Sequence, residues 1–496
     1  MALRLRFLLD TNILIPLQDS NHVLESSLID FVRLAGIGGH QLIYHPATIR
    51  DLLRDTDHKR RETSLHRLSQ YSKLDNPAPC PWNTENTSEN DACDNEILYA
   101  MECDAAHALI TEDKRIHAKA RSKGLADRVY TIQMAQNWLS GLLESKVKIP
   151  NIEDVPLHSL TPNLRDDFFN SLRDGYQPFD KWFREKASDG RRAWIYKDET
   201  DKLSAICIYA SQENETINDD QEVLHGNALK LCTFKVGESV RGRKIGELFL
   251  KMAFRHASSN ACENLFIHAN EERQDFLIRL LEDFGFSKQG TYNEDIVMVK
   301  PHPKCAPKSE GLSPLEYARR YFPHFIQDTA VKKFIVPIQP AFHETLFPDY
   351  VPKQSLLFNP TNNAGNAIKL AYLCHAPVKS IVAGDILLFY RTQDEQCLTT
   401  IGIVDKFEVL KDSAKIASLV SRRTVYSQEE IERIALKETK VILFRAVEHL
   451  AHPVSYAELQ DECGIAGPLL SIRNINDDQF SKLLSAAGRQ RDSFIN

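Results

Sequence analysis

The sequence predicts a multidomain α/β protein, and three observations lead to that fold class. The chain has 496 residues, which suggests roughly three domains at about 150 residues each. Short apolar runs alternate with helical stretches, as in parallel α/β sheets. Two stretches that contain several prolines, 146–162 and 301–314, have no clear period and are expected to be linkers. The expected segments are therefore 1–145, 150–302 and 315–496.

The composition narrows the class of protein. The apolar fraction is 43% and the formal net charge is −7, so the chain can form ordinary cores, and any nucleic-acid site needs a local basic patch. The 10 cysteines include no C-x-x-C pair, which argues against a zinc ribbon and favours a reducing compartment. No run of about 18 apolar residues occurs, so we expect a cytoplasmic protein without a membrane span.

Acidic residues recur at the ends of predicted strands in the first segment. The apolar run 6–9 leads directly into Asp10, and the strand 107–110 leads to Asp113. Asp51 lies in a helix that begins at Pro46, and Asp94 opens another helix. Chemistry in open α/β sheets lies outside the carboxyl ends of the strands, although Asp10 would also serve as an ordinary helix cap.

Several carboxylates gathered in one cleft repel each other unless a cation neutralises them. Oxygen ligands favour Mg²⁺ or Mn²⁺, and such ions assist phosphoryl displacement. We therefore expect Asp10, Asp94 and Asp113 to bind metal, and these three with Asp51 to form a catalytic site for phosphodiester hydrolysis.

These motifs also carry a family resemblance. The sequence Leu-Leu-Asp10-Thr-Asn12, the helix from Pro46 to Asp51, the helix opened by Asp94 and the strand end Thr111-Glu-Asp113 together resemble a PIN domain. The resemblance implies a Rossmann-like parallel sheet and a ribonuclease of the toxin type. The second acid of that family is usually Glu, and Asp51 is one methylene shorter. Asp91 and Glu96 remain alternatives to Asp94.

The second segment is expected to contain a helix over 164–185, a hairpin, a polar loop over 212–226 and a long strand over 229–236. That strand leads to a loop rich in glycine and arginine, which opens a helix over 247–257. Free backbone amides at a helix N-terminus make a pyrophosphate cradle. A basic surface turn is the alternative.

The whole segment resembles a GNAT-type acyl-CoA N-acetyltransferase, an α/β fold that uses acetyl-CoA. The resemblance places pantetheine beside the strand at Phe234 and Val236. It places the pyrophosphate on the loop Arg241, Gly242, Arg243, Lys244, Ile245 and Gly246. Lys244 replaces the usual middle glycine, and Leu281 replaces the tyrosine that protonates the leaving thiolate. Glu238, Glu271 and His268 are candidate general bases.

The third segment contains strongly β-prone runs at 384–390, 401–404 and 441–445, with helix starts at Ser427 and Ser455. These runs resemble the PUA-like group, which includes ASCH and EVE domains. The resemblance implies a small β-barrel with helices that binds RNA or modified bases. The side chains expected in its groove are Lys369, Arg391, Arg422, Arg423 and Tyr426, and solvated barrel rims are the alternative.

The combined expectation is a metal-dependent ribonuclease coupled to an acetyl-CoA-binding module and an RNA-binding module. Its RNA would be tRNA or mRNA. A toxin-like role, with an antitoxin-like protein partner or a homo-oligomer, follows only by analogy with toxin-type PIN and GNAT proteins. The first alternative is an N-acetyltransferase that acts on an RNA-borne or protein amine. The second alternative is a nucleic-acid-binding assembly without catalysis.

Overall fold

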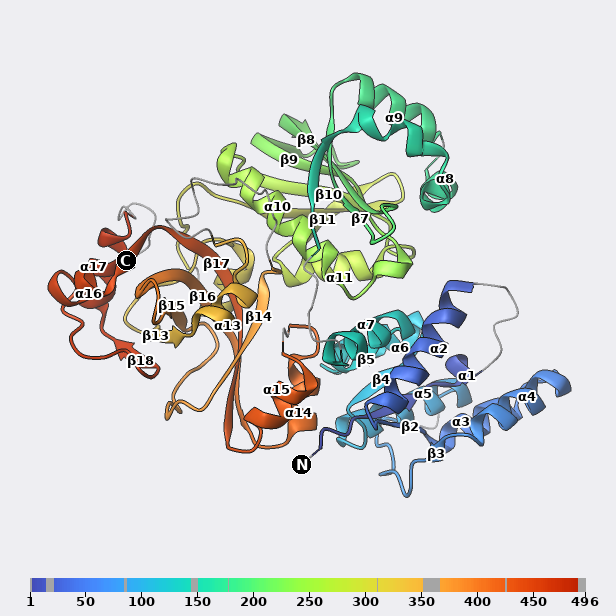
Figure 1. The fold of residues 1–496 in the computed structure, drawn as a ribbon. Coiled ribbons are helices and arrows are strands. Elements are labelled where there is room, and N and C mark those ends of the chain that lie inside the picture. Colours follow the sequence, from blue (N-terminus) through green and yellow to red (C-terminus); the bar gives the residue numbers. More distant parts are fainter. Residues whose placement is uncertain are drawn as a thin grey trace. The chain divides into compact units, whose positions relative to one another are not determined.

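The structure is a computed structural model that describes residues 2–14, 22–83, 87–143, 150–176, 178–309, 311–350, 366–423 and 426–488. It is an α/β protein with three sheets, one of them parallel and two mixed (Figure 1). The chain divides into two compact units. The first unit comprises Met1–Val147, Arg241–Arg243 and Val409–Thr439, and the second comprises Lys148–Val240, Lys244–Glu408 and Lys440–Asn496.

The first unit contains the parallel sheet that the sequence predicts. Its strands have the order β3-β2-β1-β4-β5, and every described pairing is parallel. Apolar residues fill the central strand, since Phe7, Leu8 and Leu9 are all buried. The strands are β1 Arg6–Leu9, β2 Gln41–Tyr44, β3 Ser72–Lys73, β4 Ala108–Ile110 and β5 Val129–Tyr130.

Helices cover both faces of this sheet. Successive side chains of β1 point to opposite faces, so neighbouring residues of β1 contact different helices. Phe7 packs against Phe31 of α2 and Trp138 of α7. Leu8 belongs to a second cluster with residues of α3, α5 and α6. The helices are α1 Thr11–Leu14, α2 His22–Ile37, α3 Pro46–Leu53, α4 His58–Leu68, α5 Glu89–Glu102, α6 Lys114–Ser122, the 3₁₀ turn η1 Ala126–Arg128, and α7 Ile132–Leu143.

Two helices from late in the sequence complete the first unit. They are α14 Ser413–Val420 and α15 Gln428–Ile434, and the predicted capping box at Ser427 begins α15. Arg422 donates to the carbonyl oxygens of Ala126 and Val129 at 3.0 and 2.8 Å. These bonds cover part of the edge strand β5, whose main-chain groups would otherwise face solvent.

The second unit contains a seven-stranded mixed sheet of order β11-β12-β10-β9-β8-β7-β6. Its strands are β6 Glu153–Pro156, β7 Arg192–Lys197, β8 Leu203–Thr216, β9 Val223–Val236, β10 Asn264–Ala269, β11 Ser287–Tyr292 and β12 Asp295–Pro301. The predicted loop over 212–226 is wrong, because β8 and β9 continue as a paired ribbon through most of it.

Short helices surround this sheet. The predicted helix over 164–185 is wrong as one element, since the chain there forms several short helical turns. The helices are η2 Leu157–Arg165, η3 Asp167–Phe169, α8 Asn170–Gly175, α9 Phe179–Ser188, η4 Glu238–Val240, α10 Ile245–Ser259 and α11 Asp275–Asp283.

A six-stranded sheet of order β14-β17-β16-β15-β13-β18 completes the second unit. The predicted small barrel is not found in the described part of the chain, because β14 and β18 end the sheet without pairing to each other. The strands are β13 Lys333–Ile338, β14 Lys369–Cys374, β15 Ile386–Arg391, β16 Cys397–Leu410, β17 Thr439–Ser455 and β18 Arg473–Ile475. The helices are α12 Pro314–Arg320, α13 Pro340–Leu346, α16 Tyr456–Asp461 and α17 Asp477–Ala486.

The three-segment division at 145, 150, 302 and 315 stays a prediction, and residues 146–149 of the first expected linker lie outside the described residues. Among the helices that are described, none combines the length and apolar character needed to cross a membrane.

Candidate functional site

The predicted acidic site begins at the carboxyl end of the central strand β1. The chain runs outward from β1 through β2 to β3 and then returns to the other side of β1 as β4. Ligands of open α/β sheets bind at such a reversal of strand order. Asp10, which follows β1, is 4% exposed, and Thr111 follows β4.

Asp10 is held by two hydrogen bonds. The Thr111 hydroxyl donates to Asp10 Oδ2 at 2.6 Å, and the Thr11 amide donates to Oδ1 at 2.7 Å. Asn12 Nδ2 donates to the Thr111 hydroxyl oxygen at 3.0 Å. Thr111 and Thr11 therefore fix the position of the Asp10 carboxylate, and Asn12 in turn holds the Thr111 hydroxyl.

Three of the four predicted acids lie close enough to influence one another. The pKa of Asp10 is raised to about 7, mainly by burial and to a smaller extent by the charges of Asp94 and Asp113, against the two hydrogen bonds that lower it. Burial also raises the pKa of Asp94, with contributions from Asp113 and Asp91. Like charges in a poorly solvated cleft favour the protonated form of each carboxyl group.

The fourth acid, Asp51, is not among the groups that raise the pKa of Asp10, and its carboxylate accepts a bond from Arg54 Nη2 at 2.7 Å. A cation contacts one of the other three, since Lys119 Nζ lies 3.4 Å from Asp94, and it also lies 2.6 Å from Asp91. Lys119 was not predicted, because its contact depends on how α6 lies against α5.

The arrangement does not fit a divalent metal as it stands. Within the described ranges, no group of three or more His, Cys, Asp and Glu side chains is arranged to hold an ion. The donor chemistry of Asp10, Asp94 and Asp113 suits Mg²⁺ or Mn²⁺, but Lys119 already supplies positive charge. We derive no reaction step through a metal.

The second predicted site lies where two central strands of the second unit separate. β9 and β10 pair in parallel only from Ala228–Asn264 to Leu231–Ile267. β9 continues to Val236, where it pairs only with β8, and β10 continues to Ala269, where it pairs only with β12. The separation begins beside a bulge at Cys232, where the β8–β9 register shifts between Leu231 and Thr233. Bulges bend a strand and redirect its edge.

The predicted pantetheine residues lie on this separated part of β9. Phe234 is buried and its ring packs against Phe249 of α10, while Val236 is half-buried and pairs with Ala205. The side chain of Phe234 therefore packs in the core. On the side that faces β10, the groups of β9 that a ligand can bind are main-chain N–H and C=O groups.

The predicted pyrophosphate loop precedes α10, and Arg241, Gly242 and Arg243 are grouped with the first unit. Within the second unit, Lys244 caps α10 with φ 59° and ψ 17°. This left-handed conformation favours glycine, which accounts for a family pattern with Gly at the position of Lys244. Ile245 and Gly246 form the first residues of α10, and a Cβ at Gly246 would lie 2.9 Å from Leu280.

Leu281 replaces the expected proton donor of this site, and two of the three candidate general bases have protein partners. Leu281 is fully buried in the core and cannot donate a proton. His268 Nε2 bonds the carbonyl of Ile217 at 3.1 Å, and burial lowers its pKa. Glu271 pairs with Lys288 at 3.1 Å, and Glu238 lies in η4.

The side chains expected in the basic groove of the third segment are divided between the two units, and several of them have protein partners. The groove itself stays a prediction. Lys369 pairs with Asp283 at 2.5 Å, and the largely buried Arg391 bonds Asp394 and Glu344. Arg422 belongs to the first unit, as does Arg423, and both Arg423 and Tyr426 are buried.

No family model and no curated protein matches the chain. Among solved structures, the ASCH protein from Zymomonas mobilis is 12% identical, with a TM-score of 0.23, over 31% of this chain and 94% of that protein. A putative acyl-CoA N-acyltransferase from Klebsiella pneumoniae is 15% identical, with a TM-score of 0.22, over 31% of this chain and 97% of that protein. A bacterial toxin is 18% identical, with a TM-score of 0.20, over 26% and 79%. TM-scores of this size support no statement about activity.

Proposed function

We propose that the second unit binds an acyl-CoA, with acetyl-CoA as the expected ligand. The observation that carries the proposal is the separation of β9 from β10 after Leu231 and Ile267. An extended ligand arm with amide groups pairs with an open strand edge of this kind, because main-chain groups there lack a ladder partner.

The start of α10 supports the same ligand. A 15-residue helix presents free amides and the positive end of its dipole at its N-terminus, which favours phosphate groups. The left-handed Lys244 turns the chain into the helix, and its side chain adds a cation. The negative charge of Glu247 in the first turn opposes phosphate binding, but its carboxylate accepts a bond from the main-chain amide of Lys369.

The residues present therefore fit binding better than transfer. A bound acyl-CoA supplies an activated acyl thioester. The chain's own part is to orient it along Thr233–Val236 and to stabilise the phosphates at Lys244–Gly246. Transfer of the acyl group to an RNA-borne or protein amine is a more specific proposal. Because Leu281 cannot protonate the leaving thiolate, transfer needs a proton donor from another residue.

Calorimetric titration of the full chain with acetyl-CoA tests this proposal. We expect saturable binding that weakens about tenfold or more in Lys244→Glu, because a second anion then lies beside the phosphates. Lys244→Asn is the matched control, since Asn tolerates the left-handed conformation and removes only the positive charge. Absence of binding by the wild-type chain, or equal binding by both variants, would argue against the proposal.

We propose a phosphodiesterase acting on RNA as a second candidate, located in the first unit. The observation that favours it is the mutual influence of Asp10, Asp94 and Asp113 at the reversal of strand order. Lys119 would have to leave Asp94 before a cation binds there. The proposal is therefore that divalent metal competes with this lysine.

Thermal unfolding with Mn²⁺ tests the second candidate. We expect Mn²⁺ to raise the unfolding temperature of the wild-type chain and not that of Asp10→Asn, and RNA cleavage to follow the same pattern. Asp51→Asn is the control, because Asp51 is paired with Arg54 and is not among the charges that raise the pKa of Asp10. An unchanged unfolding temperature in the wild-type chain would rule out the nuclease.

A further inference from the structure

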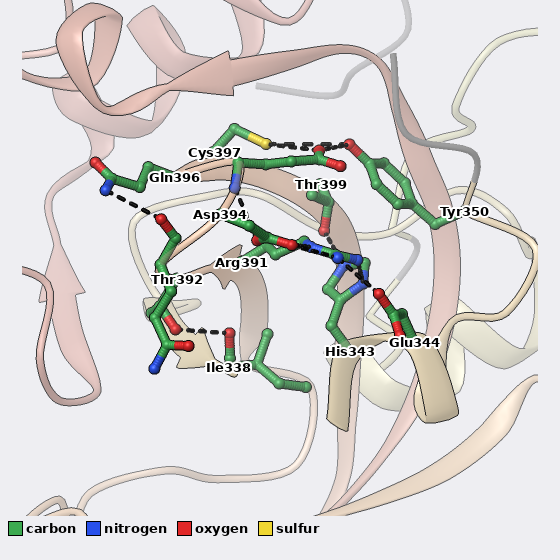
Figure 2. A network of polar contacts seen from close by, with 12 residues as sticks. Ile338, His343, Glu344, Tyr350, Arg391, Thr392, Asp394, Gln396, Cys397 and Thr399 are labelled. Atoms are coloured by element: carbon green, nitrogen blue, oxygen red, sulfur yellow. Dashed lines mark hydrogen bonds and ion pairs between the residues drawn. The ribbon is translucent and has the colours of Figure 1, made fainter. Parts of the chain in front are cut away.

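A chain of hydrogen bonds in the second unit joins a buried arginine to a buried aspartate. At one end, Arg391 of β15 is 4% exposed, and its Nη1 lies 3.4 Å from Nδ1 of His343 in α13. His343 Nε2 lies 2.7 Å from the Thr399 hydroxyl. Figure 2 shows this part, with the rest of the Arg391 guanidinium held by Asp394 and Glu344.

The chain continues through a second threonine and a second histidine. The hydroxyls of Thr399 and Thr400 are 3.2 Å apart on β16. The Thr400 hydroxyl lies 2.9 Å from Nδ1 of His449 on β17. Nε2 of His449 lies 3.3 Å from Oδ1 of Asp349.

The direction of the bonds follows from the two ends. Arginine only donates, so Nδ1 of His343 accepts and its Nε2 carries the proton. Burial and the Arg391 charge lower the pKa of His343 to about 3, which keeps this ring neutral. The Thr399 hydroxyl then accepts from His343.

A carboxylate only accepts, so at the other end Nε2–H of His449 donates to Asp349. Burial opposes the charged form of Asp349, but the bond from His449 and the charges of Lys251 and Arg255 hold the pKa of its carboxyl group well below the usual range. Nδ1 of His449 consequently accepts from the Thr400 hydroxyl.

A hydroxyl that donates to an imidazole, which in turn donates to a buried carboxylate, is the arrangement of an activated nucleophile. We propose that Thr400 is the nucleophile of a hydrolytic site for small carbonyl esters or amides, with His449 as general base and Asp349 as the residue that orients it. This site is separate from the strand opening between β9 and β10 and does not depend on acyl-CoA binding.

The reaction balances with water as the only other reactant. Thr400 Oγ1 forms a bond to the carbonyl carbon, its proton passes to His449 Nδ1, and the bond to the leaving group breaks as that group takes the proton. Water then attacks the acyl carbon and gives a proton to His449 Nδ1, and the bond from that carbon to Thr400 Oγ1 breaks as Oγ1 takes the proton back from His449. The products are a carboxylic acid and free Thr400.

The surroundings limit the size of the acyl group. Thr400 is 1% exposed, whereas the His449 side chain is 22% exposed, so the proposal requires a substrate to approach the hydroxyl past the imidazole. An acetyl group is the expected size. Lys251 and Arg255 of α10 both contact Asp349 and are positioning residues.

The test uses p-nitrophenyl acetate with the full chain. We expect release of p-nitrophenolate, and an acetyl group on Thr400 detected by peptide mass spectrometry after an acid quench. Thr400→Val, which is nearly isosteric, should slow release by at least about 100-fold, and His449→Gln by a similar factor. Thr400→Ser should stay within about tenfold of wild type and carry the label at the same position.

Thr345→Val is the matched control, because Thr345 is an exposed threonine of the same unit whose hydroxyl bonds only the Ala341 carbonyl. It should not change the rate. Circular dichroism checks the fold of each variant, and His449→Gln decides the matter if Thr400→Val does not fold. The proposal is overturned if folded variants react as fast as wild type, or if the acetyl group is found only at other residues.

Discussion

Replacing Asp10 by asparagine changes how the stability of the first unit depends on pH. The folded-state pKa of Asp10 is about 7 against an ordinary value of 3.8, so the folded state binds this proton more tightly than the unfolded state. The stability contributed by the neutral carboxyl group is present below the ordinary pKa and is lost as pH rises toward about 7. Asparagine keeps the shape of the side chain and does not titrate.

The size of the effect follows from proton linkage. Between about pH 5 and about pH 8, the wild-type chain should lose about 2.5 kcal/mol relative to Asp10→Asn. Asp10 is 4% exposed, so solvent screening does not reduce this value much.

Urea unfolding at the two pH values, followed by hydrogen exchange of peptides from β1 and β4, measures the difference. Asp51→Asn is the matched control, and its partly exposed ion pair with Arg54 predicts a change within about 0.5 kcal/mol. An Asp10→Asn advantage of equal size at both pH values would refute the argument that burial and neighbouring carboxylates raise the Asp10 pKa.

Three further predictions concern single side chains. Lys244→Gly should stabilise the second unit by about 0.5–1 kcal/mol in thermal unfolding, because glycine adopts φ 59° without strain. Arg445→Ala should cost about 3–5 kcal/mol in urea unfolding, since the buried arginine neutralises Asp405 at 2.8 Å and Asp283 at 2.7 Å. His45 accepts the Ala47 amide at the start of α3, and burial lowers its pKa from 6.5 to about 4. The free energy of unfolding therefore decreases as pH falls from 6.5 to about 4. His45→Asn should restore about 1 kcal/mol of that free energy at about pH 5.

The sequence predicted the elements whose signal is local. The apolar run before Asp10, the proline at the start of α3 and the serine caps of α15 and α16 each fix a strand or helix boundary within a few residues. Because parallel strands end at one edge, the gathering of Asp10, Asp94 and Asp113 followed from the same signals.

The sequence could not predict contacts that depend on how helices turn against one another. Lys119 reaches Asp94 only because α6 lies along α5. The distal part of the β8–β9 ribbon has a loop-like, polar sequence because most of its β8 side chains are exposed or half-buried.

The chain from Arg391 to Asp349 shows the same limit over longer range. Thr400 and His449 are neighbours because β16 and β17 lie side by side in the sheet, and they are 49 positions apart in the sequence. A single threonine in a β-prone run carries no local sign of such a partner. Only the order of the strands brings the hydroxyl, the imidazole and the carboxylate together.

Hydrogen exchange of the full chain with and without saturating acetyl-CoA tests the central claim, that the opening between β9 and β10 receives an acyl-CoA. The account predicts slower exchange in peptides that cover Thr233–Val236 and the first turn of α10, with little change in β1 and β4. Binding without protection at β9, or protection confined to other parts of the second unit, would contradict it.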